Sequence, residues 1–170
     1  MALTKPANNH QTDYLIEVLL FQVRNSVQIQ KAGAEIGRKL LELNPPEKLA
    51  IATNSFSGSL KALEDQLRYL SEQRDMILTI GGTGIGPEDF VPEATLEVCE
   101  RLLPGIPEMM RIHSATHTSK AWLSRYQCGF LGQCIILNLP GRPEPALQCL
   151  NAAGELIFHT LKKNKSFNLS

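Results

Sequence analysis

Hydrophobic positions follow two patterns along this chain: short apolar runs, and longer segments in which apolar residues recur every three or four positions. The run at residues 14–23 is rich in Leu, Val and Ile and ends before a polar stretch, which is typical of a buried strand. Residues 28–43 have the helical spacing, and Asn44, Pro45 and Pro46 end that segment. The chain is therefore predicted to begin with a buried strand and an amphipathic helix.

The same alternation continues toward the other end of the chain. Strands are predicted at residues 48–53, 76–80 and 133–139, and helices at residues 60–70, 92–102 and 146–161. Residues 54–59 are predicted as a polar turn, and residues 106–125 as a helix around Met109 and Met110 followed by polar turns. Because strands alternate with helices, we expect an α/β protein whose mostly parallel sheet is covered by helices on both faces.

A length of 170 residues fits a single domain. We expect a polar N-terminal tail at residues 1–13, the domain at residues 14–163 and a C-terminal tail at residues 164–170. Seventeen Lys and Arg balance seventeen Asp and Glu, so no net charge attracts nucleic acid or an anionic membrane. Any bound anion must therefore be held by local groups.

Segments that would carry the chain into or across a membrane are not recognisable in the sequence. No stretch approaches the ~18 uninterrupted apolar residues of a membrane span, and the polar N-terminus does not resemble a signal peptide. The four cysteines are irregularly spaced without a C-x-x-C pair, which favours reduced thiols. We expect a cytoplasmic protein with neither membrane nor nucleic-acid partners.

The most informative segment is residues 77–93, ILTIGGTGIGPEDFVPE. A buried strand leads directly into Gly81, Gly82, Thr83 and Gly84, and a helix follows. Because glycine allows close backbone approach, successive N–H groups at the end of this strand can converge on a phosphate; the plainer interpretation is a tight turn. The segment lacks both the lysine of a P-loop and the G-x-G-x-x-G pattern of dinucleotide sites.

Other candidate residues have both a functional and a structural interpretation. Asp89 could bind Mg²⁺ or orient a polar ligand, or it could only favour the dipole of the next helix. Residues 138–143 could close the same crevice, or form a proline-stiffened turn. His113 and His117 have the spacing of two zinc ligands on a helix without a recognisable third, and Trp122 is expected in the core or at a subunit interface.

Taken in order, these motifs resemble the molybdopterin-binding domain of the Mog/MoaB type, which is also the G domain of gephyrin. The family pattern GGTG-x-x-P-x-D-x-x-PEAT is matched by residues 81–95, and ILNLPG-x-P by residues 136–143. The L-PG stretch is matched by residues 103–105, and the L-SR stretch by residues 123–125. The resemblance covers residues 76–153.

The resemblance implies a three-layer α/β/α fold, a homotrimer, and adenylylation of molybdopterin with ATP and Mg²⁺ in molybdenum cofactor biosynthesis. In this family the glycine and proline loops hold the pterin and its phosphate, and acidic residues handle the magnesium ion and the triphosphate. Asp89 is thereby implied as the catalytic residue and the magnesium ligand. The residues implied in binding molybdopterin or nucleotide are Gly81, Gly82, Thr83, Gly84, Ser124, Arg125, Asn138, Pro140, Gly141 and Arg142.

The first half of the chain departs from the family at acidic positions. Residues 22–26 read QVRNS where the family has S-D-R-A-S, and residues 54–57 read NSFS where it has Pro-Asp-Glu. Glu88 replaces an arginine, and Glu144 replaces a lysine after the second loop. A magnesium and triphosphate site without those acids loses hard oxygen ligands, and a carboxylate near a phosphate is unfavourable.

Two functions are therefore compatible with the sequence. The first is an enzyme, molybdopterin adenylyltransferase. The second is a catalytically degenerate relative that only binds molybdopterin or nucleotide, or that acts as an assembly partner. An unrelated small-molecule role on the same fold is a third possibility.

Overall fold

The computed structural model describes residues 13–21, 26–43 and 48–167, and these form a six-stranded sheet in the order β2-β1-β3-β6-β5-β4. Strands β1 (Tyr14–Phe21), β2 (Leu49–Phe56), β3 (Met76–Ile80) and β6 (Cys134–Leu139) pair in parallel. The short strands β5 (Cys128–Leu131) and β4 (Arg101–Leu102) extend one edge in antiparallel pairing. The predicted, mostly parallel sheet is confirmed.

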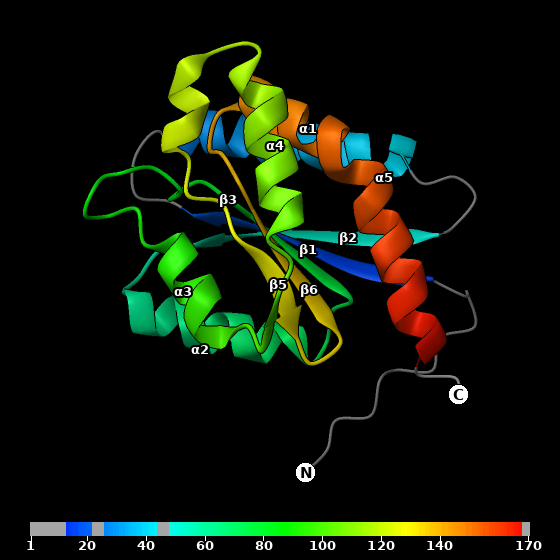
Figure 1. Cartoon of the computed structure of the whole chain (residues 1–170). Coiled ribbons are helices and arrows are strands. Elements are labelled where there is room, and N and C mark those ends of the chain that lie inside the picture. Colours follow the sequence, from blue (N-terminus) through cyan, green and yellow to red (C-terminus); the bar gives the residue numbers. More distant parts are fainter. Residues whose placement is uncertain (1–12, 22–25, 44–47, 168–170) are drawn as a thin grey trace.

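Helices cover both faces of the sheet (Figure 1). One face carries α1 (Ser26–Leu43), α4 (Gly105–Ala115) and α5 (Pro143–Phe167), and the other carries α2 (Leu60–Ser71) and α3 (Val91–Val98). The 3₁₀ helix η1 (Ser119–Leu123) follows α4. Because side chains alternate along a strand, Ile16, Val18 and Leu20 of β1 enter one core, whereas Leu19 and Phe21 enter the other. The three-layer α/β/α fold is confirmed.

Several predicted boundaries were wrong, and pairing between distant segments explains most of them. The predicted turn at 54–59 begins with strand, since β2 continues to Phe56 opposite Phe21 of β1. The helix predicted to reach residue 102 ends at Val98, because the amide of Glu100 donates to Phe130 of the unpredicted strand β5. Helix α5 extends beyond the predicted residues 146–161, and Pro143 suits its first turn because proline has no N–H to satisfy there. The last residues of the first predicted strand, 22 and 23, lie outside the described residues.

Asn138 of β6 is a fully buried polar residue whose side chain joins three elements. Its Nδ2 donates to the hydroxyls of Thr79 in β3 and Thr95 in α3, each at 2.9 Å. Its Oδ1 accepts from the amide of Gln127 at 3.1 Å. A buried amide is stable only when its hydrogen-bonding groups are satisfied, so this side chain fixes the relative positions of its partners.

No helix among the described residues combines the length and apolarity that a membrane span requires. All four cysteines are free thiols. Burial raises the pKa of the Cys99 thiol to about 11 and that of Cys128 to about 12, so both are neutral near pH 7.

The substitution Asn138→Leu is expected to lower the free energy of unfolding by about 3 kcal/mol, because it keeps the volume but leaves buried hydrogen-bonding groups without their partner. Urea unfolding followed by circular dichroism measures the change. The same substitution at the exposed Asn151 of α5 is the control and is expected to change stability by less than about 0.5 kcal/mol. Equal effects at the two positions would contradict the bridging role of Asn138.

Candidate functional site

The two predicted loops meet at the carboxyl edge of the parallel strands. The first, Gly81 to Gly84, leaves β3, and the second, Pro140 to Arg142, leaves the adjacent strand β6. The amide of Gly81 donates to the carbonyl oxygen of Leu139 at 3.0 Å. A Cβ placed on Gly141 would lie 3.2 Å from the Cα of Gly81, so a side chain here would push the two loops a few tenths of an ångström apart. The loops are therefore in direct contact, which agrees with the first of the two interpretations that the sequence allowed.

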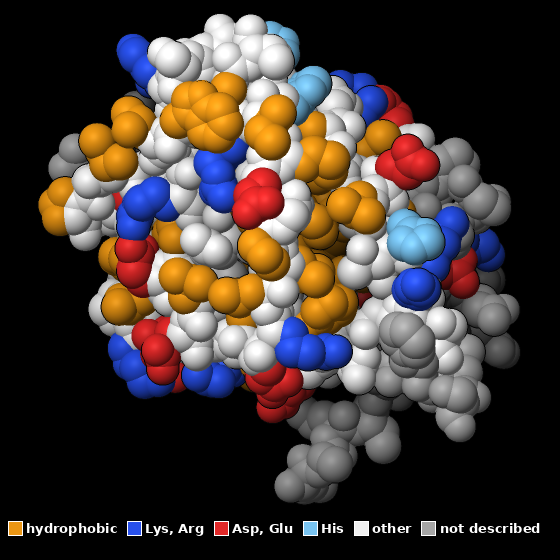
Figure 2. Space-filling model, viewed as in Figure 1, with side chains coloured by type: hydrophobic (Ala, Val, Ile, Leu, Met, Phe, Trp, Pro, Cys, Tyr) orange, Lys and Arg blue, Asp and Glu red, His pale blue; other side chains and the backbone are white. Residues whose placement is uncertain are grey.

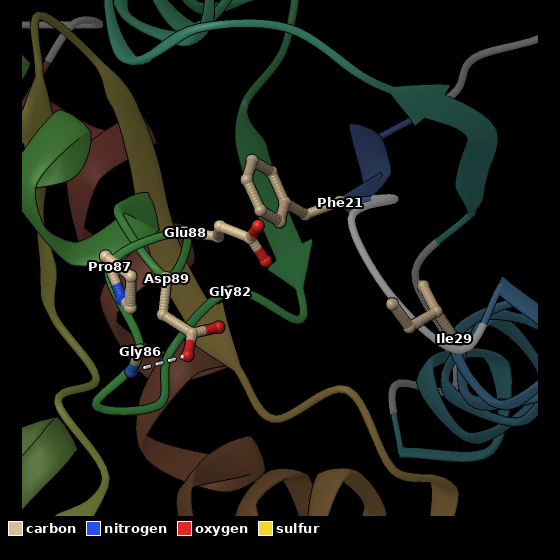
Figure 3. Close-up of a pocket in the computed structure, with 7 residues that line it drawn as sticks. All are labelled: Phe21, Ile29, Gly82, Gly86, Pro87, Glu88 and Asp89. Carbon is tan, nitrogen blue, oxygen red and sulfur yellow. Dashed lines mark hydrogen bonds between the residues drawn. The ribbon is translucent and has the colours of Figure 1, made fainter.

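A pocket of about 200 Å³ opens between these loops and the first turn of α1. An adjoining hollow of about 100 Å³ lies beneath the glycine loop and shares Ile29, Gly82 and Asp89 with it. Figure 3 shows the side chains of Phe21, Glu88 and Asp89 around this hollow. The larger pocket is lined by Gln28, Ile29, Gly81, Gly82, Thr83, Gly84, Asp89, Gly141 and Arg142.

The glycine loop has a backbone conformation that other residues rarely adopt. The φ angles of Gly81 and Gly82 are +97° and +64°. A Cβ on Gly82 would also lie 2.6 Å from Cδ1 of Phe21 and 2.6 Å from Cγ2 of Val91. Glycine is therefore required at this position for both conformation and space.

Asp89 lies in the loop that connects the glycines to α3. Its Oδ2 accepts from the amide of Gly86 at 3.0 Å (Figure 3), and its backbone amide donates to the Gly86 carbonyl at 3.0 Å. A Cβ on Gly84 would lie 2.7 Å from Oδ2, so the absent side chain leaves room for the carboxylate. Asp89 is thereby held against the loop while it lines both hollows.

The larger pocket has the groups that bind an anion. The backbone amides of Gly82, Thr83 and Gly84 donate to no acceptor among the described residues. Arg142 lines the pocket immediately before α5, and Gln28 lines it from the first turn of α1. Helix N-termini carry partial positive charge, so both helices favour negative charge here. The arrangement suits a phosphate group.

The donor set fits a magnesium ion only when phosphate oxygens complete it. Within residues 13–21, 26–43 and 48–167, no group of three or more His, Cys, Asp or Glu side chains could hold a metal ion. Magnesium is commonly bound by one or two carboxylates together with the phosphates of a substrate. Asp89 could supply such a carboxylate, so an ion would arrive with a nucleotide.

Four predicted ligand-binding residues do not line this pocket. The Asn138 side chain is fully buried and hydrogen-bonded to three partners, so it does not line the pocket in which it was expected to contact a ligand. The guanidinium of Arg125 is directed at the backbone of the loop from residue 84 to residue 89. Ser124 and Pro140 lie in segments beside the pocket without lining it.

The family's acidic residues are replaced at residues 22–26 and 54–57, and the structure describes the second group in full but only the last residue of the first. Residues 22–25 lie outside the described residues. Asn54 donates to Oε1 of the fully buried Glu17 at 2.7 Å, so its side chain is engaged within the sheet layer. The ring of Phe56 stacks on the ring of Phe21 with their centroids 6.0 Å apart. The ring of Phe90 contacts the ring of Phe21 edge-on with a centroid distance of 5.0 Å. An aromatic cluster, Phe21, Phe56 and Phe90, therefore packs under the glycine loop.

Sequence reasoning missed the contributions of Phe21, Gln28 and Ile29 to the two hollows. The signal was nevertheless present, because a helix that follows a parallel strand begins at the carboxyl edge where ligands bind. Trp122 does not lie in the core, since 59% of its surface is exposed. His113 near the end of α4 and His117 in the turn after it have ring centroids 5.5 Å apart, with no third ligand among the described residues.

Comparison with known proteins agrees with this arrangement. The family model described as a probable molybdopterin binding domain matches residues 53–161. The chain belongs to this family. The match begins in β2, so β1, α1 and residues 22–26, which depart from the family pattern, lie outside it.

Individual relatives of the molybdopterin-binding family match parts of the chain. The molybdopterin adenylyltransferases of Helicobacter pylori J99 and Escherichia coli K12 are 44% identical over 80 residues and 40% identical over 88 residues. These matches cover 47% and 49% of this chain, and 46% and 45% of the relatives. The chain thus spans about half the length of the curated relatives it matches.

Solved structures match over nearly the whole chain. The molybdopterin biosynthesis enzyme MoaB of Thermus thermophilus is 30% identical with a TM-score of 0.75, covering 90% of this chain and 97% of that one. A molybdopterin biosynthesis protein of Mycobacterium abscessus has a TM-score of 0.80 at 22% identity, covering 91% and 98%. The latter likeness shows the shared fold.

Gly82→Ala is expected to destabilise this molybdopterin-binding domain by about 2 kcal/mol more than Gly132→Ala. Both glycines have positive φ, but a Cβ on Gly132 meets nothing within 4 Å, whereas one on Gly82 collides with two side chains. Urea unfolding of both variants separates the steric cost from the conformational one. Equal destabilisation would show that the loop moves to accommodate the methyl group.

Proposed function

We propose that this protein binds molybdopterin and transfers an adenylyl group to it from ATP in molybdenum cofactor biosynthesis. The observation that carries the proposal is the pocket in which the glycine loop, Arg142 and Asp89 converge at the carboxyl edge of the sheet. Membership of the molybdopterin-binding family and the names of the similar adenylyltransferases support the choice of substrate.

In the proposed reaction, the phosphate of molybdopterin attacks the α-phosphorus of ATP. A new phosphoanhydride bond forms, the bond between the α- and β-phosphates breaks, and pyrophosphate leaves with its electron pair. The chain contributes positioning and neutralisation of charge: the glycine-loop amides and Arg142 hold phosphate oxygens, and Asp89 is a ligand for magnesium bound to the triphosphate.

Binding without transfer is the second candidate function, and a specific observation favours it. The family acids are replaced at residues 54–57, where Asn54 bonds Glu17 and Phe56 packs on Phe21. These residues provide no carboxylate for a second magnesium contact. An assay for adenylylated product with ATP, magnesium and molybdopterin decides between the two: product supports transfer, and molybdopterin binding without product supports the second function.

Asp89→Asn is expected to weaken binding of the magnesium complex of ATP by about tenfold, because an amide replaces a charged metal ligand. Isothermal titration calorimetry measures the dissociation constant. The sign is decisive, since removal of a negative charge that serves no ligand would tighten the binding of an anion. Glu97→Gln, which removes one exposed charge from α3, is the matched control and is expected to leave binding unchanged.

A homotrimer is proposed as the assembly, supported by an apolar face. Figure 2 shows hydrophobic side chains gathered around α4 and the neighbouring 3₁₀ helix η1. Ile112, Trp122 and Leu123 are 60%, 59% and 56% exposed there. Exposed apolar surface of this kind commonly marks an interface between proteins.

The free thiols support a reducing cytoplasm as the place of action.

Trp122→Glu is expected to convert the trimer to monomers of 18.8 kDa, because a charge placed in an apolar interface loses its hydration. Size-exclusion chromatography with light scattering measures the mass. Tyr69→Glu is the control, since Tyr69 is 58% exposed on α2, which covers the opposite face of the sheet. A wild-type mass of 18.8 kDa would contradict the proposed trimer.

A further inference from the structure

Arg125 makes an unusual number of contacts with the loop that carries Asp89. Its Nε donates to the carbonyl of Gly84 at 2.6 Å, and one terminal nitrogen donates to the carbonyl of Asp89. The other terminal nitrogen forms an ion pair with Glu93 in the first turn of α3. Its own amide donates to the carbonyl of Thr83 at 3.1 Å. One residue therefore ties both ends of the loop from residue 84 to residue 89.

The segment that carries Arg125 is itself anchored to the rest of the fold. We refer to residues 124–127 as the supporting segment. Arg111 of α4 donates to the carbonyls of Ser124 and Tyr126 at 3.4 and 3.3 Å. The side-chain oxygen of Asn138 accepts from the backbone amide of Gln127 at 3.1 Å, and the backbone amide of Asn138 donates to the Gln127 carbonyl at 3.0 Å. The supporting segment thus connects α4 and β6 to the loop.

We propose that Arg125 is a positioning residue that holds the carboxylate of Asp89 in the binding-competent geometry, by fixing the loop from residue 84 to residue 89, without contacting the ligand. This inference rests on the proposed function, because it gives the L-SR motif a role in the same site. The planar guanidinium presents donors in several directions, so it can bond two carbonyls and a carboxylate at once. The Lys ammonium is a single point and cannot span these acceptors.

The positive charge of Arg125 is paired with groups of the same chain. Glu93 neutralises it, and the two carbonyls of Gly84 and Asp89 take its remaining directions. Arg142 lines the pocket between the two loops and is exposed, whereas Arg125 lines a different hollow, beside the loop from residue 84 to residue 89. The two arginines therefore have distinguishable roles. Arg125 depends on the planar guanidinium that bonds several acceptors, and Arg142 depends on its positive charge.

Substitution by lysine separates the two roles. Arg142→Lys keeps a positive charge beside a phosphate and is expected to bind magnesium–ATP and molybdopterin within about threefold of wild type, whereas Arg142→Gln binds about tenfold more weakly. Arg125→Lys and Arg125→Gln are both expected to bind these probes about tenfold more weakly than wild type, because neither side chain can bond the two carbonyls and the carboxylate at once. Titration calorimetry with each probe measures these constants.

Hydrogen exchange gives a readout that does not depend on any ligand. The amides of Gly86 and Asp89 are bonded within the loop, to the carboxylate of Asp89 and the carbonyl of Gly86. In Arg125→Lys and Arg125→Gln they are expected to exchange about tenfold faster, while amides of β3 keep their protection. Preserved protection in β3 shows that the variants are folded.

A double substitution tests whether Arg125 acts through Asp89. If it does, Asp89→Asn combined with Arg125→Gln binds no more than about twofold more weakly than Asp89→Asn alone. If Arg125 contacts the ligand independently, the two losses multiply.

The outcomes of the proposed function and of this inference are distinct. A wild-type protein that binds neither probe overturns the proposed function, and loop exchange still decides whether Arg125 holds the loop. Wild-type binding and unchanged exchange in Arg125→Lys would overturn the positioning role while the proposed function stands. Multiplying losses in the double variant would overturn it as well.

Discussion

The buried amide of Asn138 is the interaction on which the geometry of the site depends. It bonds Thr79 in β3, Thr95 in α3 and the amide of Gln127 in the supporting segment. The glycine loop follows β3 two residues after Thr79, and the chain continues through Asp89 into α3, which begins four residues before Thr95. Arg125 of the supporting segment donates a hydrogen bond to this loop. One satisfied polar group in the core therefore aligns the three elements that border the loop.

Charge at the site is local rather than global. The chain has no formal net charge, and attraction of a phosphate depends on glycine-loop amides, two helix N-termini and Arg142. Glu88 and Asp89 line the adjoining hollow and oppose a triphosphate. Under the proposed function, binding of a nucleotide here would therefore depend on a divalent cation, whereas a ligand with one phosphate has less charge to neutralise.

The departures from the family pattern have a common structural consequence. Where the family has acids before the second helix, Phe56 packs with Phe21 and Phe90 beneath the glycine loop. Apolar packing stabilises the underside of the loop but supplies no oxygen ligands for a metal ion. The loops proposed to bind a phosphate are thus retained, whereas the residues that would hold the triphosphate with its metal ion are altered. This contrast separates the two candidate functions.

Periodicity alone determined the layer order of this protein, because buried parallel strands and amphipathic helices have distinct hydrophobic patterns. The motifs likewise predicted that Gly81 to Gly84, Asp89, Gly141 and Arg142 converge, since parallel strands end at one edge. Strands β4 and β5 were not predicted, because their short segments pair only through contacts distant in the sequence. The same motifs also placed Arg125 and Asn138 at the ligand, but only the tertiary structure decided where their side chains point. A motif identifies a residue near a site, whereas the partners that satisfy its polar groups decide whether it faces the ligand or supports the loop that does.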